Sequence, residues 1–516
     1  MKSIYKSSLF IAAFFTVMSF AGCDKYLDVN TDPNRATDNN ITADLIFPNA
    51  AVEVGSLQAN AYWSATTSNF ASNNFVSLNR WMGYWGWPGD YSIDQEETSY
   101  NINFSTSDQI WTRYYNTLFD LRLVETKAIA NGDSVLAGAS LILSAKLWQE
   151  LVDAFGNIPY SQAFQAELYQ NPTYDKGTDV YAALQTNLDK AIVLVDKTAK
   201  KTFPVTDIVF AGDVQKWKRF ANTLKLRLLL RQAETTYKTA APIAELTKIA
   251  ATGGILASGE SVSVNPGFTN SAGKQSPFYA TYGKTATGAD ASATARANNF
   301  FTTLLSKNGD GRDLYFFTTV GGNVIGTTYG LPQGNPNGSV SSQPGPGVAN
   351  NAAQAAWIIP SFESGFFHAE AIARGWMSDE TAQTAYEDAV TQSFVWLGDS
   401  AVHATTYLAT SDIAMWANAG TTVQSQVNFI LTQKYISLCS IDALEAWSDY
   451  RKMNKATIPA SVTSNNGDVY TLLSVNPARG TNTIPLRMLY PQSEYTANPN
   501  TPKDKDVTRI FWIPQY

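Results

Sequence analysis

Helical periodicity dominates the pattern of apolar and polar positions along the chain. Apolar residues recur every three to four positions in two neighbouring segments, 110–130 and 135–155, as expected for one buried face of an α-helix. Asn131, Gly132 and Asp133 separate these segments. Glycine commonly ends a helix and aspartate commonly begins one, so the pattern predicts two helices joined by a short turn.

Paired helical segments of this kind recur three more times along the chain. They cover residues 180–195 with 214–232, 361–376 with 380–396, and 424–438 with 441–453. In the third of the four pairs, Ser378 and Asp379 interrupt the pattern, and Asp379 is a candidate cap for the second helix. We therefore expect a mainly α protein with four tetratricopeptide-like helix pairs, although no strict repeat of about 34 residues connects them.

Long irregular stretches separate these helix pairs. Residues 253–295 and 321–351 are rich in glycine, asparagine, serine, threonine and aromatic residues. Loops of this length inside a compact domain usually carry function. The pattern predicts a loop-rich, irregular half beside the helical half, with both halves in a single domain over residues 41–516.

The N-terminus has the pattern of an export signal. Lys2 and Lys6 accompany an apolar segment, residues 9–20, which is too short to span a bilayer as a helix. The segment ends in the tripeptide Ala-Gly-Cys at Cys23, which resembles the recognition site for lipoprotein signal peptidase. We expect residues 1–22 to be a cleaved signal peptide.

Cys23 would then become the lipidated first residue of the mature chain. Two or three acyl chains hold a protein on a membrane where a single chain would exchange, so this residue predicts a stable membrane anchor. The polar residues 23–40 are expected to form a tether between the anchor and the fold. Cys439 is the only other cysteine, so no intramolecular disulfide is available.

Charge and composition exclude several classes of function. The formal net charge of −7 argues against a nucleic-acid partner. His368 and His403 are the only histidines, which leaves few candidates for a metal centre or a catalytic triad. We expect no cofactor. A structural calcium ion stays open, because oxygen ligands leave no spacing signature outside dedicated loops.

The most unusual cluster of aromatic residues lies at positions 80–91, where glycine and proline alternate with large rings. This composition argues against a helix or a strand, and exposed aromatic side chains often mark binding surfaces. Flat rings suit sugars, because a pyranose presents an apolar C–H face. Tyr279 and Tyr282, beside the long loops, are secondary candidates. The predicted ligand-binding residues are Trp81, Tyr84, Trp85, Trp87, Tyr91, Tyr329 and Trp357.

The opposite interpretation is that this aromatic loop fills the core of the irregular half. Trp148 and Trp447 differ from the loop residues, because they lie on strongly periodic helices and are expected in the core. Lys225, Arg227 and Arg231 share one flank of a predicted helix and are expected to form a solvated face.

Five segments, in order along the chain, carry recognisable signatures. They are CDKYLD at 23–28, LVDAFGNIPY at 151–160, HAEA at 368–371, EAWSDYR at 445–451 and RMLYPQSEY at 487–495. Together they resemble the SusD/RagB-like outer-membrane nutrient-binding lipoproteins of Gram-negative bacteria. The stretch Gln433-Lys434-Tyr435 lacks the Glu-Arg pair of the starch-binding type member, so the resemblance does not imply starch as the ligand.

The resemblance implies a SusD-like fold on the outer membrane and a SusC-like, TonB-dependent barrel as partner. With the aromatic cluster, it predicts a surface protein that binds an oligosaccharide and delivers it to the barrel without catalysis. Three alternatives stay open: a peptide ligand, a lid that touches no ligand, and a surface glycoside hydrolase. Hydrolysis needs only two suitably spaced carboxylates, such as Glu96 and Glu97, or Glu363 and Glu370.

Overall fold

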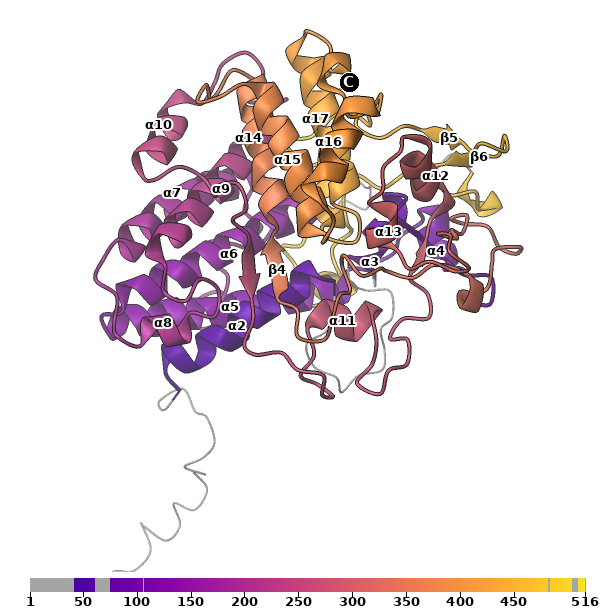
Figure 1. Ribbon diagram of the computed structural model, residues 1–516. Coiled ribbons are helices and arrows are strands. Elements are labelled where there is room, and N and C mark those ends of the chain that lie inside the picture. Colours follow the sequence, from indigo (N-terminus) through magenta and orange to yellow (C-terminus); the bar gives the residue numbers. More distant parts are fainter. Residues whose placement is uncertain (1–40, 61–74, 105, 481–482, 504–508, 516) are drawn as a thin grey trace, which may run out of the picture. The chain divides into compact units, whose positions relative to one another are not determined.

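The computed structural model describes residues 41–60, 75–104, 106–480, 483–503 and 509–515 (Figure 1). From Ala43 onward the chain forms one compact unit. The predicted signal peptide, the lipidated Cys23 and the tether all lie outside the described residues.

Helices supply most of the regular structure, which confirms the mainly α fold. The longer helices are α2 (Ala43–Gln58), α5 (Asp108–Ala130), α6 (Ser134–Phe155), α7 (Gly177–Val195), α9 (Val214–Arg231), α14 (Ser361–Ala373), α15 (Ala382–Trp396), α16 (Ala401–Thr410), α17 (Val423–Ser437) and α18 (Ala443–Lys452). The shorter helices are α3 (Val76–Trp81), α4 (Gln95–Ser99), α8 (Phe203–Thr206), α10 (Ile243–Ala251), α11 (Pro277–Tyr282), α12 (Asn299–Lys307), α13 (Asp313–Phe316) and α19 (Gln492–Ala497).

All eight helices of the predicted pairs are present, and the two members of each pair are in contact: α5 with α6, α7 with α9, α14 with α15, and α17 with α18. The break between α5 and α6 lies where glycine and aspartate predict it, because Gly132 has a φ of +70° and Asp133 accepts a hydrogen bond from the Leu136 amide. The cap of α15 differs from the prediction. Thr381 caps this helix, whereas Asp379 lies 3.0 Å from His368 Nε2.

Helix α6 is the central element of the helical region. It contacts α2, α5, α7, α9 and α18, and every residue from Val135 to Phe155 is buried. By length and composition α6 could cross a membrane, but its apolar window is entirely buried within the protein. Such burial is typical of the core helix of a globular fold.

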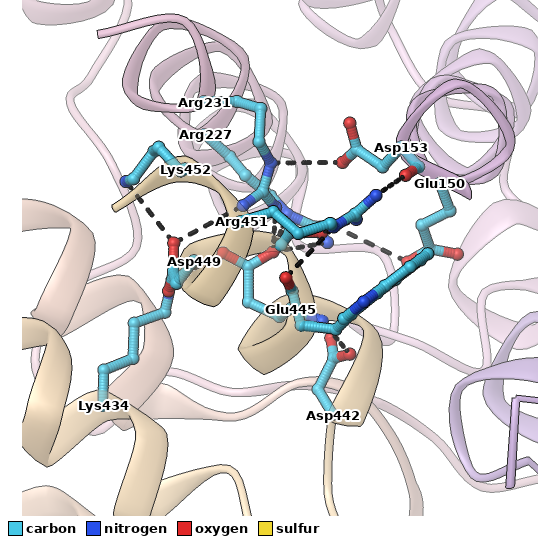
Figure 2. Close-up of polar contacts among 12 residues, drawn as sticks. Glu150, Asp153, Arg227, Arg231, Lys434, Asp442, Glu445, Asp449, Arg451 and Lys452 are labelled. Atoms are coloured by element: carbon cyan, nitrogen blue, oxygen red, sulfur yellow. Dashed lines mark hydrogen bonds and ion pairs between the residues drawn. The ribbon is translucent and has the colours of Figure 1, made fainter. Parts of the chain in front are cut away.

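The core also contains a network of buried charges where α6, α9, α17 and α18 meet (Figure 2). Glu445 of α18 accepts from Arg231 and lies 2.9 Å from Arg227 Nη2 and 2.5 Å from Lys434 Nζ. Burial alone would raise the pKa of the Glu445 carboxyl, but these three cations hold the pKa well below its ordinary value. The carboxylate is therefore ionised inside the core.

This network corrects the expectation of a solvated face on α9. Lys225, Arg227 and Arg231 are each at most 2% exposed. Lys225 pairs with Asp189 of α7, and Arg231 reaches Asp153 of α6 as well as Glu445. The periodicity placed these cations on one flank correctly, but acidic partners from other helices cover that flank.

Strands are short and occur only as antiparallel pairs in the described part of the chain. They are β1 (Trp85–Gly86) with β3 (Arg296–Ala297), β2 (Val262–Val264) with β4 (Ala356–Ile359), and β5 (Ser461–Thr463) with β6 (Val469–Thr471). Trp85 pairs with Ala297 and Gly86 with Arg296. The β1–β3 pair thus attaches the aromatic loop to the long irregular stretch that begins after α10.

Candidate ligand-binding site

The aromatic loop at positions 80–91 turns most of its rings inward. Trp81, Tyr84 and Trp85 are each 0% exposed. The Tyr84 hydroxyl donates to the Tyr435 carbonyl oxygen at 2.6 Å, and Trp85 Nε1–H donates to Ser440 Oγ at 2.8 Å. A tyrosine or tryptophan whose polar atom is hydrogen-bonded is stable in a core. The sequence analysis predicted that these three rings are exposed, and this prediction is wrong.

Two further predicted residues, Tyr329 and Trp357, are also buried. The Tyr329 hydroxyl and Trp81 Nε1–H both donate to the Glu97 carbonyl oxygen, at 3.1 Å and 3.3 Å. Trp357 Nε1–H donates to the Ile441 carbonyl oxygen at 3.1 Å. The expectation that these two rings face solvent is also wrong, because their polar atoms find hydrogen-bond acceptors inside the core.

Trp87 and Tyr91 are the predicted residues that keep exposed surface. Trp87 is half-buried: its Nε1–H donates to Glu97 Oε1 at 3.1 Å, and the Arg80 guanidinium lies 4.1 Å from the ring centroid. Arg80 therefore occupies one face of the Trp87 ring. Tyr91 is 45% exposed. Ligand binding by these two residues stays a prediction.

A pocket of about 430 Å³, which we call the loop pocket, opens among the irregular stretches that follow α11 and α13. Its lining combines one aromatic ring with hydroxyl, amide and backbone groups and one pair of opposite charges. The lining residues are Tyr279, Gly283, Lys284, Asp290, Thr318, Thr319, Val320, Gly338, Ser339, Ser341, Gln343, Pro344, Gly345, Pro346, Ala349 and Asn350.

Helix α11 connects the loop pocket to the buried aromatic layer. Tyr279, a secondary candidate from the sequence, lines the pocket and is half-buried. Tyr282 is buried, and its ring centroid lies 4.9 Å from that of Trp85. Phe278 continues the layer to Trp357, with a centroid distance of 4.9 Å. Trp85 and Trp357 thus support the element that presents Tyr279.

Arg296 fixes the backbone beside the pocket. Its side chain is buried and donates to the carbonyl oxygens of Ser292, Ala295 and Gly338, at 3.1, 2.8 and 3.2 Å. Burial lowers the pKa of Arg296, and the negative charge of Asp290 opposes this shift. The guanidinium therefore connects β3 to the backbone at Gly338 through hydrogen bonds.

One ion pair, between Lys284 and Asp290, lies among the residues that line the pocket. Asp290 accepts from Lys284 Nζ and, at 2.6 Å, from Gln343 Nε2. The hydrogen bond from Lys284 is the main cause of the lowered pKa of Asp290, so this carboxylate is ionised at neutral pH. The pair adds no net charge, and the pocket presents chiefly neutral hydrogen-bonding groups.

Sequence reasoning located the long loops and Tyr279, but it missed the polar residues that complete the pocket. Asp290 and Gln343 lie 53 positions apart and show no motif. The carboxylates considered for hydrolysis, Glu96 with Glu97 and Glu363 with Glu370, are absent from the lining of this pocket. Within the described residues, no three His, Cys, Asp or Glu side chains gather as a metal site.

Comparison with known proteins identifies the family. A SusD-like family model, described as "Starch-binding associating with outer membrane", matches residues 47–491. The chain belongs to the SusD/RagB-like family. As a family member, this SusD-like protein is a nutrient-binding protein associated with the outer membrane.

Solved structures of SusD homologues share its fold. A chitin-binding SusD homologue from Flavobacterium johnsoniae is 22% identical, with a TM-score of 0.72 over 91% of this chain and 99% of that chain. A SusD homologue from Bacteroides vulgatus is 20% identical, with a TM-score of 0.70 over 90% and 97%. A SusD/RagB family protein from Bacteroides thetaiotaomicron is 18% identical, with a TM-score of 0.66 over 92% and 100%. No curated protein sequence matches this SusD-like protein.

Proposed function

We propose that this protein captures an oligosaccharide in the loop pocket and delivers it to a SusC-like, TonB-dependent barrel without cleaving it. The composition of the loop pocket supports this proposal. Tyr279 supplies a ring face, while Thr318, Ser341 and Gln343 supply neutral hydrogen-bonding groups, in a lining whose only ion pair is compensated. A sugar combines apolar C–H faces with many uncharged hydroxyls and matches such a surface.

Expected magnitudes agree with a capture role. Burying a large apolar side chain contributes about 1.5–3 kcal/mol, and each net hydrogen bond contributes about 1 kcal/mol. After the cost of association, one or two ring contacts and a few hydrogen bonds correspond to dissociation constants of about micromolar to millimolar. Affinity in this range allows release of the ligand to a transporter.

The test is calorimetric titration of the full-length protein, purified from membranes in detergent, with oligosaccharides and peptides. The panel includes chito-oligosaccharides, because the chitin-binding homologue shares the fold, and malto-oligosaccharides, because the family model is described as starch-binding. We expect an oligosaccharide to bind and Tyr279→Ala to weaken binding at least about tenfold, because the variant loses a ring face.

Tyr169→Ala is the matched control, because Tyr169 is 40% exposed but does not line the loop pocket. Peptide binding without sugar binding would indicate the peptide-binding alternative. Release of shorter sugars would indicate a glycoside hydrolase. A protein that binds neither class would be a lid that makes no ligand contact.

The lipid anchor needs a separate test. Cys23→Ser removes the thiol to which the lipid would be attached. We expect the wild-type protein in the outer-membrane fraction, exposed to added protease on intact cells, and the variant released from the membrane. Co-purification of a TonB-dependent barrel with the wild-type protein would support the proposed partner.

A further inference from the structure

A second cavity, which we call the helix pocket, lies among α5, α6 and α7 and has a volume of about 210 Å³. It shares no lining residue with the loop pocket. The helix pocket is lined by Leu118, Arg122, Glu125, Leu141, Ser144, Ala145, Trp148, Tyr160, Ser161, Phe164, Leu184 and Asn187.

The size and apolar lining of the helix pocket suit one ring. Leu118, Leu141 and Leu184 are buried leucines from three helices, and Trp148 and Phe164 add aromatic surface. A cavity of about 150 Å³ lined by apolar side chains admits benzene. The helix pocket therefore has room for a six-membered ring and one small polar substituent.

Phe164 is held at this pocket in an unfavourable backbone conformation. Its φ is +62°, which is uncommon for a bulky residue and costs on the order of 1–3 kcal/mol. Ring contacts stabilise this arrangement, with centroid distances of 5.7 Å to Phe119 and 6.0 Å to both Tyr115 and Trp148. Strained residues persist where the surrounding structure fixes them, often at binding sites.

Two neutral donors of the helix pocket have no acceptor among the described residues. Trp148 is only 8% exposed, and its Nε1–H donates to no group in the described part of the chain. The Tyr160 hydroxyl accepts from Asn187 Nδ2 at 2.8 Å, and its own proton has no described acceptor. Burial raises the pKa of Tyr160 to about 12, so this hydroxyl keeps its proton at neutral pH.

Arg122 supplies the one charge in this lining that has no counter-ion among the described residues. Glu125, the one acid in this lining, is paired with Lys190 at 2.8 Å. A guanidinium presents parallel N–H groups that match the two oxygens of a carboxylate. These three donors, one of them charged, line the same small space and match the acceptor oxygens of an anion.

We infer that the helix pocket binds a carboxylate carried on a single six-membered ring. The ring would pack against Trp148 and Phe164, and the carboxylate would accept from Arg122 and from the Trp148 and Tyr160 donors. Two sources share this chemistry: a uronic acid, free or at the end of an acidic glycan, and a small aromatic acid. This site does not depend on the function proposed for the loop pocket.

The test titrates the full-length protein in detergent with glucuronate, phenylacetate and glucose, each of which has one six-membered ring. We expect at least one of the two acids to bind about tenfold or more tightly than glucose, because glucose has no carboxylate for Arg122. Binding of glucuronate alone would assign an acidic sugar, and binding of phenylacetate alone would assign an aromatic acid. Failure of both acids to bind, or equal binding of glucose, would overturn the inference.

Arg122→Gln is the decisive variant, because an exposed side chain can be shortened without loss of core packing. We expect it to weaken binding of the acid at least about tenfold, whereas Lys201→Gln, an equal loss of charge at an exposed site, leaves binding unchanged. Trp148→Phe keeps an aromatic ring but removes one donor, and should give a smaller loss. Tyr279→Ala should not change binding of the acid, because Tyr279 lines the loop pocket and not the helix pocket. A failed test of the helix pocket can therefore be told apart from a failed test of the loop pocket.

Discussion

The helical core and the aromatic loop both bury polar groups, but they satisfy them differently. In the helical core, charges from separate helices compensate one another, as Glu445 does for Arg231 and Lys434. In the aromatic loop, the buried Tyr84 and Trp85 donate to neutral acceptors, and a single buried ion pair joins Arg80 to Glu97. A charge left without its partner costs more than a neutral group left without one, so the helical core tolerates less substitution.

Glu445→Gln is expected to change the free energy of unfolding most. Removing the carboxylate leaves Arg231, Arg227 and Lys434 with less negative charge in the core, and should lower the free energy of unfolding by about 3–5 kcal/mol. Urea denaturation measures the change. Glu260→Gln is the control, because Glu260 pairs with Arg219 at 2.6 Å in a partly exposed position and should cost at most about 1 kcal/mol. An equal loss of unfolding free energy in both variants would show that buried and partly exposed ion pairs contribute alike to stability.

Trp85→Phe tests the aromatic loop. The substitution keeps a ring but removes the donor to Ser440 and leaves a small cavity, which should cost about 2–3 kcal/mol in the same assay. Tyr91→Ala, on the exposed side of the same loop, should change stability by less than about 0.5 kcal/mol. A neutral result for Trp85→Phe would mean that the loop is not part of the core.

The pH dependence of the free energy of unfolding tests the role of Glu363. Burial, followed by the charges of Asp442 and Glu445, raises the pKa of its carboxyl from 4.5 to about 8. Between these two values the unfolded chain releases a proton that the folded protein keeps, so this group lowers stability as the pH rises from about 4.5 to about 8. Glu363→Gln should remove that loss and exceed the wild-type stability by about 1 kcal/mol or more at pH 8. A constant difference between pH 5 and pH 8 would show that Glu363 does not titrate in this range.

The smallest effect is expected for Asp196→Asn. Asp196 pairs with Lys218 at 2.9 Å, but its side chain is 61% exposed. Loss of this pair should cost less than about 0.5 kcal/mol, and added salt should reduce even that difference. A large effect would mean that water exposure does not separate weak from strong ion pairs in this protein.

Local information in the sequence was sufficient for the eight paired helices, but it missed α2 and the charged residues that cover α9. Periodicity and the Gly132–Asp133 break predicted α5 and α6, because both signals come from neighbouring residues. The burial of Arg231 was missed because its acidic partners lie 78 and 214 positions away. No local pattern distinguishes a solvated cation from one that meets such a partner.

The candidate site shows the same limit. Glycine and proline between the rings predicted neither helix nor strand at residues 80–91, which is wrong for Arg80–Trp81 at the end of α3 and for Trp85–Gly86 in β1. The composition of the long stretches indicated function near Tyr279, which stays a prediction. The acceptors for Tyr84 and Trp85 lie 351 and 355 positions away, so the direction of those rings was not encoded nearby. The polar lining of the loop pocket, such as Asp290 with Gln343, depends on the same kind of distant pairing.

The hydrogen bonds from Tyr84 and Trp85 also set an order of assembly. Both acceptors, at Tyr435 and Ser440, are made only when most of the chain has been synthesised. Contacts between such distant positions close large loops and slow folding. A chain truncated before Tyr435 would hold two large rings without their hydrogen-bond acceptors. The aromatic loop therefore reaches its native packing only when the chain is nearly complete.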